Sequence, residues 1–432
     1  MNPNNAGQAL LPSQAPTLFR PLSIRAVTFK NRIFVSPMCM YSAASDPAHP
    51  DCGALTDFHL AHLGHLAIKG VGLVIIEATA VQPCGRISPN DAGLWSSKTA
   101  SAGAGNQLEQ LQKTVAFLHS QGAKVGLQLA HAGRKASTLP PWISAQARAQ
   151  GTRIGKADRS VNGWPEDVVG PSGGVEQRWS GEDDEASFWP PRELSIPEIE
   201  EIVRAFAASA ARAVQAGVDV LEIHAAHGYL LHQFLSPVTN RRRDAYGGSF
   251  DNRIRLLREI VAAVRAAIPT TMPLFLRISA TEWLEDSAVA RACGGSWDLA
   301  ATRRLLPLLP DWGVDFLDVS SGGNHRHQRI TPHPTYQVDL AAQLRREMRA
   351  QGIMTLVGAV GLITQAHAAS AIPQQPDEEA QAAENMLSGS QPCADAVLMA
   401  RQFLREPEWV INAAKTLGVE ISVPVQFARA LT

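Results

Sequence analysis

The segment Val218-Asp-Val-Leu-Glu-Ile-His-Ala-Ala-His-Gly-Tyr229 decides how this chain folds, because it joins a short aliphatic run to a cluster of polar aromatic side chains. A helical pattern over residues 196–216 leads into it. That pattern begins after Ser195 and Glu198, which form a capping-box sequence, and Gly217 ends it. A helix followed by an aliphatic strand that ends in polar residues is typical of one unit of an α/β fold.

The same alternation recurs along the chain. A second clear helical pattern covers residues 254–267, with apolar side chains at helical spacing. Eight short aliphatic or β-branched runs are candidate strands: 32–36, 72–77, 124–129, 218–223, 273–278, 314–319, 353–357 and 394–399. Such an alternation predicts a closed parallel barrel rather than an open sheet. We therefore expect an α/β protein in which residues 18–432 form one (β/α)8 TIM barrel domain with long loop insertions.

Composition argues against several classes of function. The 432 residues carry a formal net charge of −1, so no basic excess indicates binding to nucleic acid or to an anionic membrane. No apolar run is long enough to span a membrane, and residues 1–16 lack the pattern of a signal peptide. The five cysteines contain no CxxC pair, which argues against a disulfide framework and against a zinc or iron–sulfur site. We expect a cytoplasmic protein.

Several stretches depart from the barrel pattern. Residues 1–17 are expected to form a disordered arm. Residues 138–192 are rich in Pro, Gly, Ser and Trp and lie on the side where barrel active sites form, so they could be a lid. Residues 282–296 extend the loop after the fifth strand. Residues 372–393 are rich in Gln, Glu and Pro and are expected to be a solvated insertion.

The histidine cluster after the fourth strand is the strongest local signal of chemistry. His224 and His227 could converge above the barrel and donate hydrogen bonds to a carbonyl or nitro oxygen that gains charge as a hydride arrives. Tyr229 could deliver a proton to the other carbon of the alkene. The same histidines could also be half of a metal site, as in a metal-dependent barrel hydrolase or lyase, or could be satisfied by backbone carbonyls. The spacing alone leaves these alternatives open.

Other polar residues end the strands. Gln128 and Arg277 end the third and fifth runs, and a buried arginine needs an anion, which could be a flavin or the partner in a structural salt bridge. Gly358-Ala-Val-Gly361 follows the seventh run and Ala400-Arg401 the eighth, where barrels commonly bind phosphate through backbone N–H groups. No GxGxxG motif opens a βαβ unit, so a Rossmann site for NAD is not expected.

Five ordered motifs identify a family. They are Lys30-Asn-Arg-Ile33, Ser36-Pro-Met-Cys-Met-Tyr41, Gln128-Leu-Ala-His-Ala-Gly-Arg-Lys135, Glu222-Ile-His-Ala-Ala-His-Gly-Tyr-Leu230, and Asn240 followed by Tyr246-Gly-Gly248. With these motifs the chain resembles the old yellow enzyme family of FMN-dependent ene-reductases over residues 18–429, in particular its thermophilic-like branch. The resemblance implies a bound FMN, a supply of NADPH or NADH, and an α,β-unsaturated carbonyl compound or nitroalkene as substrate.

The resemblance also implies roles for individual residues. Ser36, Pro37, Met38 and Cys39 would line the flavin, with Cys39 tuning its redox potential. Ala78, Gln128 and Arg277 would contact the flavin ring, whereas Gly361, Ala400 and Arg401 would hold the phosphate. His224 and His227 would bind the substrate oxygen, Tyr229 would donate the proton and Tyr41 would shape the pocket. Arg429 would reach into the active site of a neighbouring subunit, so we expect a homodimer or a larger homo-oligomer.

The sequence departs from the family pattern in three places. Ala400 stands where glycine is frequent, Phe427 stands where tyrosine is common, and the stretch 138–192 is longer than in compact bacterial members and looks more like fungal ones. An iron–sulfur flavoprotein related to this family would need a cysteine cluster, which the chain lacks. A non-catalytic flavin-binding protein is a further alternative.

Overall fold

A computed structural model of the chain describes residues 5–96, 106–180, 186–331, 333–361 and 376–431. Its centre is a closed barrel of parallel strands in the order β3-β4-β5-β8-β9-β10-β11-β12, with β12 pairing with β3. The strands are β3 (Ile33–Val35), β4 (Leu73–Ala80), β5 (Lys124–Ala130), β8 (Val220–Ala225), β9 (Leu274–Ser279), β10 (Phe316–Ser320), β11 (Leu356–Val360) and β12 (Ala396–Met399). The predicted (β/α)8 barrel is confirmed.

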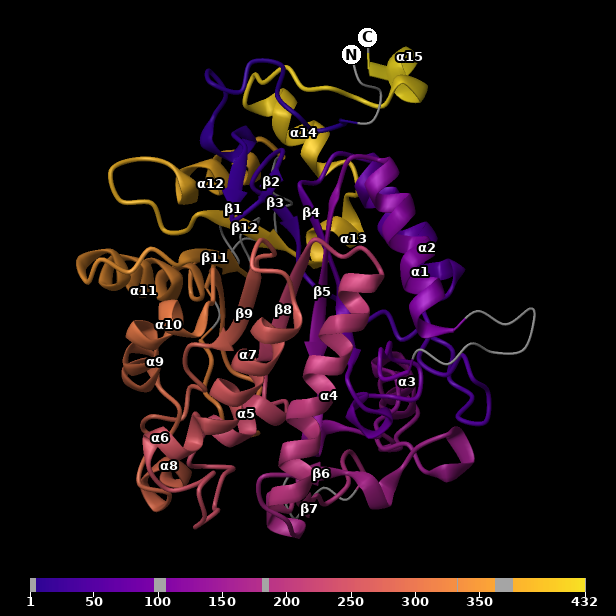
Figure 1. Cartoon of the computed structure of the whole chain (residues 1–432), viewed down its shortest axis with the longest axis vertical. Helices are drawn as coiled ribbons and strands as arrows, with labels where there is room; N and C mark the ends of the chain where they lie inside the picture. The colour runs from indigo at the N-terminus through magenta and orange to yellow at the C-terminus, as the bar shows by residue number, and fades with distance from the viewer. Residues whose placement is uncertain (1–4, 97–105, 181–185, 332, 362–375, 432) are drawn as a thin grey trace.

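Helices surround the barrel (Figure 1). Those that connect successive barrel strands or follow the last one are α1 (Asp57–Ile68), α2 (Gln107–Ser120), α4 (Ile196–Gln215), α7 (Arg255–Ala267), α9 (Leu299–Leu305), α10 (Leu309–Trp312), α11 (Val338–Ala350), α12 (Pro376–Leu387), α13 (Arg401–Arg405) and α14 (Trp409–Thr416). The loops and termini contain further helices: α3 (Pro141–Ala149), α5 (Leu230–Leu235), α6 (Phe250–Arg253), α8 (Ala288–Ala292) and α15 (Ala428–Leu431). They also contain two small sheets of two strands each. One pairs β1 (Leu22–Ile24) with β2 (Val27–Phe29), and the other pairs β6 (Val169–Gly170) with β7 (Arg192–Glu193). None of the helices in these ranges is long and apolar enough to cross a membrane.

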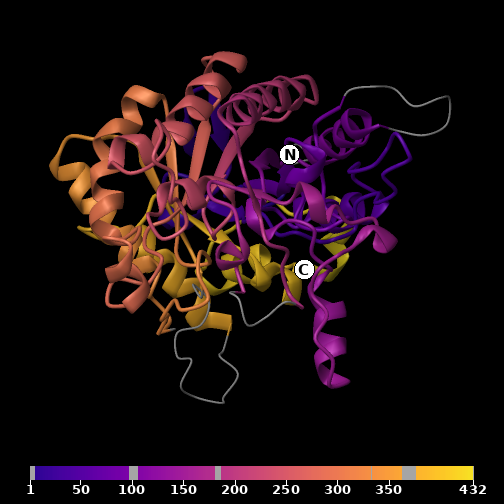
Figure 2. The ribbon, with the colours of Figure 1, turned by 90° about the horizontal axis from the view of Figure 1, so that it is seen from below.

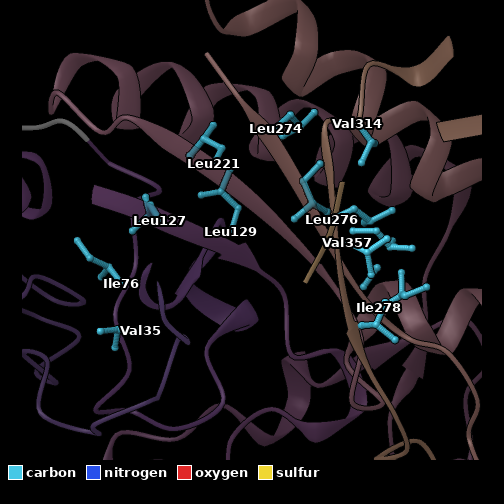
Figure 3. Packing of buried hydrophobic residues seen from close by; sticks show 14 of the residues in the cluster. Val35, Ile76, Leu127, Leu129, Leu221, Leu274, Leu276, Ile278, Val314 and Val357 are labelled. Atoms are coloured by element: carbon cyan, nitrogen blue, oxygen red, sulfur yellow. The ribbon is translucent and has the colours of Figure 1, made fainter. Parts of the chain in front are cut away.

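Side chains alternate between the two faces of the barrel wall, as the period of a strand requires. Those directed outward, including Val35, Leu127 and Leu276, pack into one large apolar core with the helices (Figure 3). Those directed inward include Phe275 and Phe316, whose rings stack with centroids 4.3 Å apart in a separate apolar cluster. This cluster fills the interior below the polar residues that face the candidate site.

The seventh strand differs from its expected position. It was expected over residues 353–357 but runs to Val360, so Gly358 lies inside β11 and only Gly361 follows it. The space above Gly358 is filled, because a Cβ atom there would lie 2.5 Å from both the Phe316 ring and Leu398 Cδ1. Glycine is therefore required by packing against neighbouring strands rather than by a turn.

The N-terminal segment also differs from what the sequence predicts. Residues 1–17 were expected to be a disordered arm, yet residues 5–17 are ordered against the C-terminal segment. Ala9 forms an antiparallel bridge with Ile421, and the N–H of Gly7 donates to Ser422 O at 2.8 Å. Both ends of the chain accordingly lie at the same end of the barrel (Figure 1).

The stretch 372–393 is not a solvated insertion where the structure describes it. Residues 376–387 form α12, which packs against α14 and buries Ala380 and Ala383. Glu384 on the same helix accepts hydrogen bonds from the N–H groups of Thr17 and Leu18 at 3.0 and 2.8 Å. This part of the chain is the helix between the last two barrel strands, and 372–375 lie outside the described residues.

The insertion 138–192 contains α3 and the pair β6–β7, and residues 181–185 lie outside its described part. Viewed from below, it lies to one side of the barrel and α3 projects from it (Figure 2). The N–H of Thr138 donates to Ile87 O at 2.8 Å, and Trp179 Nε1 donates to Gly323 O at 2.9 Å. These bonds fix the insertion over the loops that follow β4 and β10.

Candidate active site

The histidine pair is built by β8 and the turn that follows it. His224 is a buried residue within β8, opposite Arg277 of β9, and its ring centroid lies 5.2 Å from that of His227. His227 adopts a left-handed conformation with φ of 58°, held by its N–H, which donates to Ser279 Oγ at 2.9 Å. Its Nε2 lies 2.6 Å from Ser320 Oγ. Two neighbouring strands thus orient His227.

The turn also needs a glycine. Gly228 has φ of 72°, and a Cβ atom there would lie 2.2 Å from Gly323 O. The loop after β10 therefore packs directly on the turn after β8. Strained left-handed residues of this kind gather at functional sites, where the surrounding structure holds them in place.

Burial fixes the protonation of this cluster. Burial lowers the pKa of both His224 and His227 well below the ordinary value, and the charge of Arg277 lowers it further. Both imidazoles are therefore neutral at neutral pH, so each carries a single N–H. The Tyr229 ring lies 5.0 Å from the His224 ring, and burial raises the pKa of its phenol well above its usual value. The phenol keeps its proton, so it can act as an acid.

The segment after β3 forms the opposite wall. The N–H of Ser36 donates to Met399 O at 2.8 Å, and that of Met40 donates to Glu77 Oε2 at 3.2 Å. Burial, followed by the negative charges of Asp91 and Glu77, raises the pKa of Cys39, so its side chain is a thiol rather than a thiolate. Pro37 and Met38 are half-buried in the same segment.

Tyr41 closes this wall near the insertion. It has φ of 51°, and its ring makes an edge contact with Trp142 of α3 at 5.5 Å. Burial raises the pKa of its phenol, which therefore stays protonated. Tyr41 and Tyr229 both line one cavity, so the segment after β3 and the turn after β8 meet there.

The residues expected to hold the flavin ring combine one buried hydroxyl with two side chains that have partners inside the barrel. The hydroxyl of Ser36 is buried without a partner among the described residues. Gln128 Nε2 donates to Glu222 Oε1 at 2.7 Å, and Arg277 Nε lies 3.1 Å from Asp318 Oδ2. The structural salt bridge considered for Arg277 is therefore present, and Arg277 is also the neighbour of His224 across β8 and β9, close enough for its charge to act on that imidazole. Ala78 on β4 offers only a methyl group.

The residues expected to hold the phosphate come together at the ends of β11 and β12, which are neighbours in the barrel. Gly361 has φ of 92°, and a Cβ atom there would lie 2.0 Å from Gln337 Nε2, so glycine is needed. Ala400 precedes α13, and Arg401 begins it with an exposed side chain. This arrangement suits an anionic group bound by backbone N–H groups and a guanidinium.

A cavity of about 790 Å³ has Tyr229, from the turn after β8, in its wall. Lys135, Tyr41 and Tyr229 line its inner end. The insertion supplies most of its outer wall, with Leu139, Ile154, Trp179 and Phe188 among the lining residues. The lining also includes charged side chains such as Lys135, Arg148 and Arg326, and the volume is within the range of small-molecule sites.

The sequence reasoning missed Lys135, although it lies at the end of a quoted motif. Its Nζ donates to His227 O at 2.9 Å and to Gly323 O at 3.1 Å. It also lies 5.1 Å from the centre of the Tyr229 ring. Burial lowers its pKa to about 7. The position of Lys135 within a polar motif was the one sign in the sequence that it belongs to the site. Its partners could not be predicted, because they come from distant loops.

One alternative and one expectation concern groups that a single chain does not bring together. Among the described residues, no group of three His, Cys, Asp or Glu side chains is arranged to hold a metal, so the metal alternative has no ligand set there. Arg429 is exposed on α15, which lies with α14 at the end of the barrel opposite α5 and the β6–β7 pair (Figure 1). Its expected contact with a neighbouring subunit stays a prediction.

Known proteins resemble the chain over nearly its whole length. A family model described as the NADH:flavin oxidoreductase / NADH oxidase family matches residues 17–420. An NADH:flavin oxidoreductase of Gibberella zeae is 43% identical over 418 residues, which cover 96% of this chain and 89% of the relative. An NADPH dehydrogenase of Bacillus subtilis is 37% identical over 415 residues, which cover 96% of this chain and 99% of the relative.

Solved structures share the architecture. Morphinone reductase in complex with tetrahydroNAD matches with a TM-score of 0.64 at 25% identity and covers 95% of this chain and 94% of its own. The old yellow enzyme homologue from Zymomonas mobilis matches with a TM-score of 0.64 at 24% identity and covers 94% of this chain and 95% of its own. The second likeness supports the barrel fold alone.

Proposed function

Because the chain belongs to the NADH:flavin oxidoreductase / NADH oxidase family, which includes the old yellow enzymes, we propose that it is an FMN-dependent ene-reductase. It would take reducing equivalents from NADPH or NADH and reduce the activated C=C bond of an α,β-unsaturated carbonyl or nitro compound. The observation that carries the proposal is the contact between two neutral imidazoles and a protonated phenol at the mouth of the barrel.

Three sets of residues would bind different parts of the cofactor. Ser36, Pro37, Met38 and Cys39 would line the flavin, Ala78, Gln128 and Arg277 would contact its ring, and Gly361, Ala400 and Arg401 would hold its phosphate. FMN, when bound, would accept hydride from the nicotinamide and supply it to the alkene. The unpartnered Ser36 hydroxyl and the guanidinium beside His224 support this assignment.

The substrate would be bound and protonated by residues of β8 and its turn. His224 and His227 each carry an N–H that could donate to the carbonyl or nitro oxygen, where negative charge develops during reduction. Tyr229 would give its proton to the carbon next to the activating group. Tyr41 and the insertion would shape the cavity and limit the access of water.

The first experiment is a visible spectrum of the purified protein, followed by NADPH and then cyclohexenone without oxygen. A yellow protein that bleaches with NADPH and recovers its colour with the enone would display both half-reactions. A yellow protein that bleaches but does not recover with the enone would contradict the proposed substrate class. A colourless protein that takes up no added FMN would contradict the proposal as a whole.

A single substitution tests the proton donor. Tyr229→Phe should slow alkene reduction by about 10²-fold or more, the size expected for loss of a general acid, and should leave flavin reduction by NADPH nearly unchanged. Stopped-flow absorbance measures the two half-reactions separately. Tyr246→Phe is the matched control, because the Tyr246 hydroxyl donates to Glu259 at 2.9 Å on the outer side of the barrel. An equal loss in both half-reactions for Tyr229→Phe would remove the assigned role.

A further inference from the structure

Two carboxyl groups and one guanidinium form a buried layer inside the barrel, directly below the candidate flavin site. Glu222 comes from β8, Arg277 from β9 and Asp318 from β10, and both carboxyl side chains are 0% exposed. Arg277 pairs in register with Asp318 on one side and with His224 on the other. The apolar cluster that contains Phe275 and Phe316 lies beneath the layer. Water therefore has little access to these charges.

The charges in this layer do not balance if both acids are ionised. Two carboxylates against one guanidinium would leave a net negative charge in the interior, which is strongly unfavourable without further donors. Gln128 donates to Glu222 Oε1, but Glu222 Oε2 and both oxygens of Asp318 accept no hydrogen bond from any described residue. A carboxyl group that keeps its proton would remove the imbalance and supply the missing donor.

The electrostatics favour one proton in the pair. Burial is the main cause that raises the pKa of both carboxyl groups, and the charge of Asp318 raises that of Glu222 further, whereas Arg277 lowers both. The other groups that face the pair supply no balancing charge, because Gln128 is uncharged and burial keeps His224 neutral.

We propose that Glu222 and Asp318 hold a single proton between them, with Glu222 Oε2–H donating to the Asp318 carboxylate. The cluster with Arg277 is then neutral overall, and Glu222 Oε2, which otherwise has no hydrogen-bond partner among the described residues, gains one. Glu222 and Asp318 act here as positioning residues, because they fix the guanidinium and set the net charge below the flavin site. The part of this inference that concerns flavin rests on the proposed function.

The shared proton has a consequence for the cofactor. When the pair loses its proton at high pH, an uncompensated negative charge appears below Arg277. That charge would oppose any further negative charge on a reduced flavin, so it would lower the flavin's midpoint potential. The pair thus makes the electrostatic influence of Arg277 depend on pH.

Infrared spectroscopy of the flavin-free full-length protein tests the shared proton directly. At neutral pH the wild-type minus Glu222→Gln difference spectrum should contain the carbonyl band of one protonated carboxylic acid, which shifts in D2O. Asp318→Asn should also lose this band, because Glu222 would then face Arg277 alone and ionise. Glu347→Gln, which changes a carboxylate paired with Arg303 at 2.8 Å on the surface, should leave the band unchanged. A wild-type spectrum whose acid bands persist in both variants would overturn the proposal.

The midpoint potential of bound FMN tests the coupling. Spectroelectrochemical titration should give similar potentials for wild type and Glu222→Gln at low pH, and the wild-type potential should fall below that of the variant as the pH rises. Parallel curves over the whole range would overturn the coupling. A chain that binds no FMN would instead refute the proposed function, and the infrared result would still decide whether the proton is shared. Should Glu222→Gln fail to fold, Asp318→Asn provides the same infrared comparison.

Discussion

His227 shows how far a residue's role depends on strands that are distant in the sequence. The spacing of His224 and His227 predicted that they converge, and the structure places their rings 5.2 Å apart. The serines that orient His227, at the ends of β9 and β10, gave no signal in the sequence. A serine at a strand end is common, and only the folded barrel brings its hydroxyl within reach of the imidazole.

The histidine role leads to a binding prediction. His227→Ala should weaken the binding of a phenol that mimics the charged substrate oxygen by about tenfold or more, because one hydrogen bond to an anion contributes roughly 1.5–3 kcal/mol. Titration of the flavin absorbance with the phenol gives the dissociation constant. His62→Ala on α1 is the matched control and should leave the affinity unchanged. Unaltered affinity in His227→Ala would refute the oxyanion site.

Lys135 and the Glu222–Asp318 pair were missed for the same physical reason. Lys135 donates to carbonyl groups 92 and 188 residues away. Sequence spacing reports contacts along one helix or strand. It does not report contacts across a closed barrel.

At the scale of elements, α4 begins where its sequence predicts and is stabilised by its cap. The Ser195 N–H donates to Glu198 Oε2 at 2.8 Å, and Arg192 pairs with the same carboxylate at 2.7 Å. The hydrogen bond from Arg192 and then that from Ser195 lower the pKa of Glu198 to about 2. A carboxylate whose pKa falls on folding stabilises the protein above its unfolded pKa, and this contribution is lost as the pH falls through the folded pKa.

Glu198→Gln should therefore reduce the free energy of unfolding by about 1 kcal/mol at pH 7, as expected for a weakened cap. The difference from wild type should shrink as the pH falls below 4.5 and should vanish near pH 2. Urea denaturation at a series of pH values measures it. Glu201→Gln, on the same helix and paired with Arg204 on the surface, should have a much smaller effect. A pH-independent difference for Glu198→Gln would show that the charge is not responsible.

The barrel strands were predicted well because buried parallel strands are nearly continuous apolar runs. The positions at which the strands end were predicted less accurately. Gly358 was interpreted as the start of a loop, but it lies inside β11, where it makes room for the Phe316 ring. The polar composition of 372–393 likewise did not indicate the helix α12, whose buried side chains are mostly small or lie near its end: Ala380, Ala383, Glu384, Met386 and Leu387.

At the scale of the whole molecule, Asn31 joins segments that the sequence did not connect. Its buried amide donates to Gly7 O at 3.0 Å and to Gly70 O at 2.9 Å, and Gly7 in turn bonds to Ser422. The N-terminal arm, the loop after α1 and the C-terminal segment are thereby tied together at the end of the barrel away from the candidate site. The tail that carries Arg429 leaves from this anchored end.

The position of Arg429 makes its expected role dependent on a second subunit. α15 lies at the opposite end of the barrel from the elements around the histidine turn, so Arg429 can serve an active site only in a neighbouring copy (Figure 1). A protein with Tyr229→Phe and a protein with Arg429→Ala should therefore complement each other when co-expressed. Each hybrid dimer holds one site in which both residues are intact, so random pairing should restore about a quarter of the wild-type rate of enone reduction. Each variant alone supplies the baseline, and a mixture no more active than the average of the two would show that Arg429 does not act across subunits.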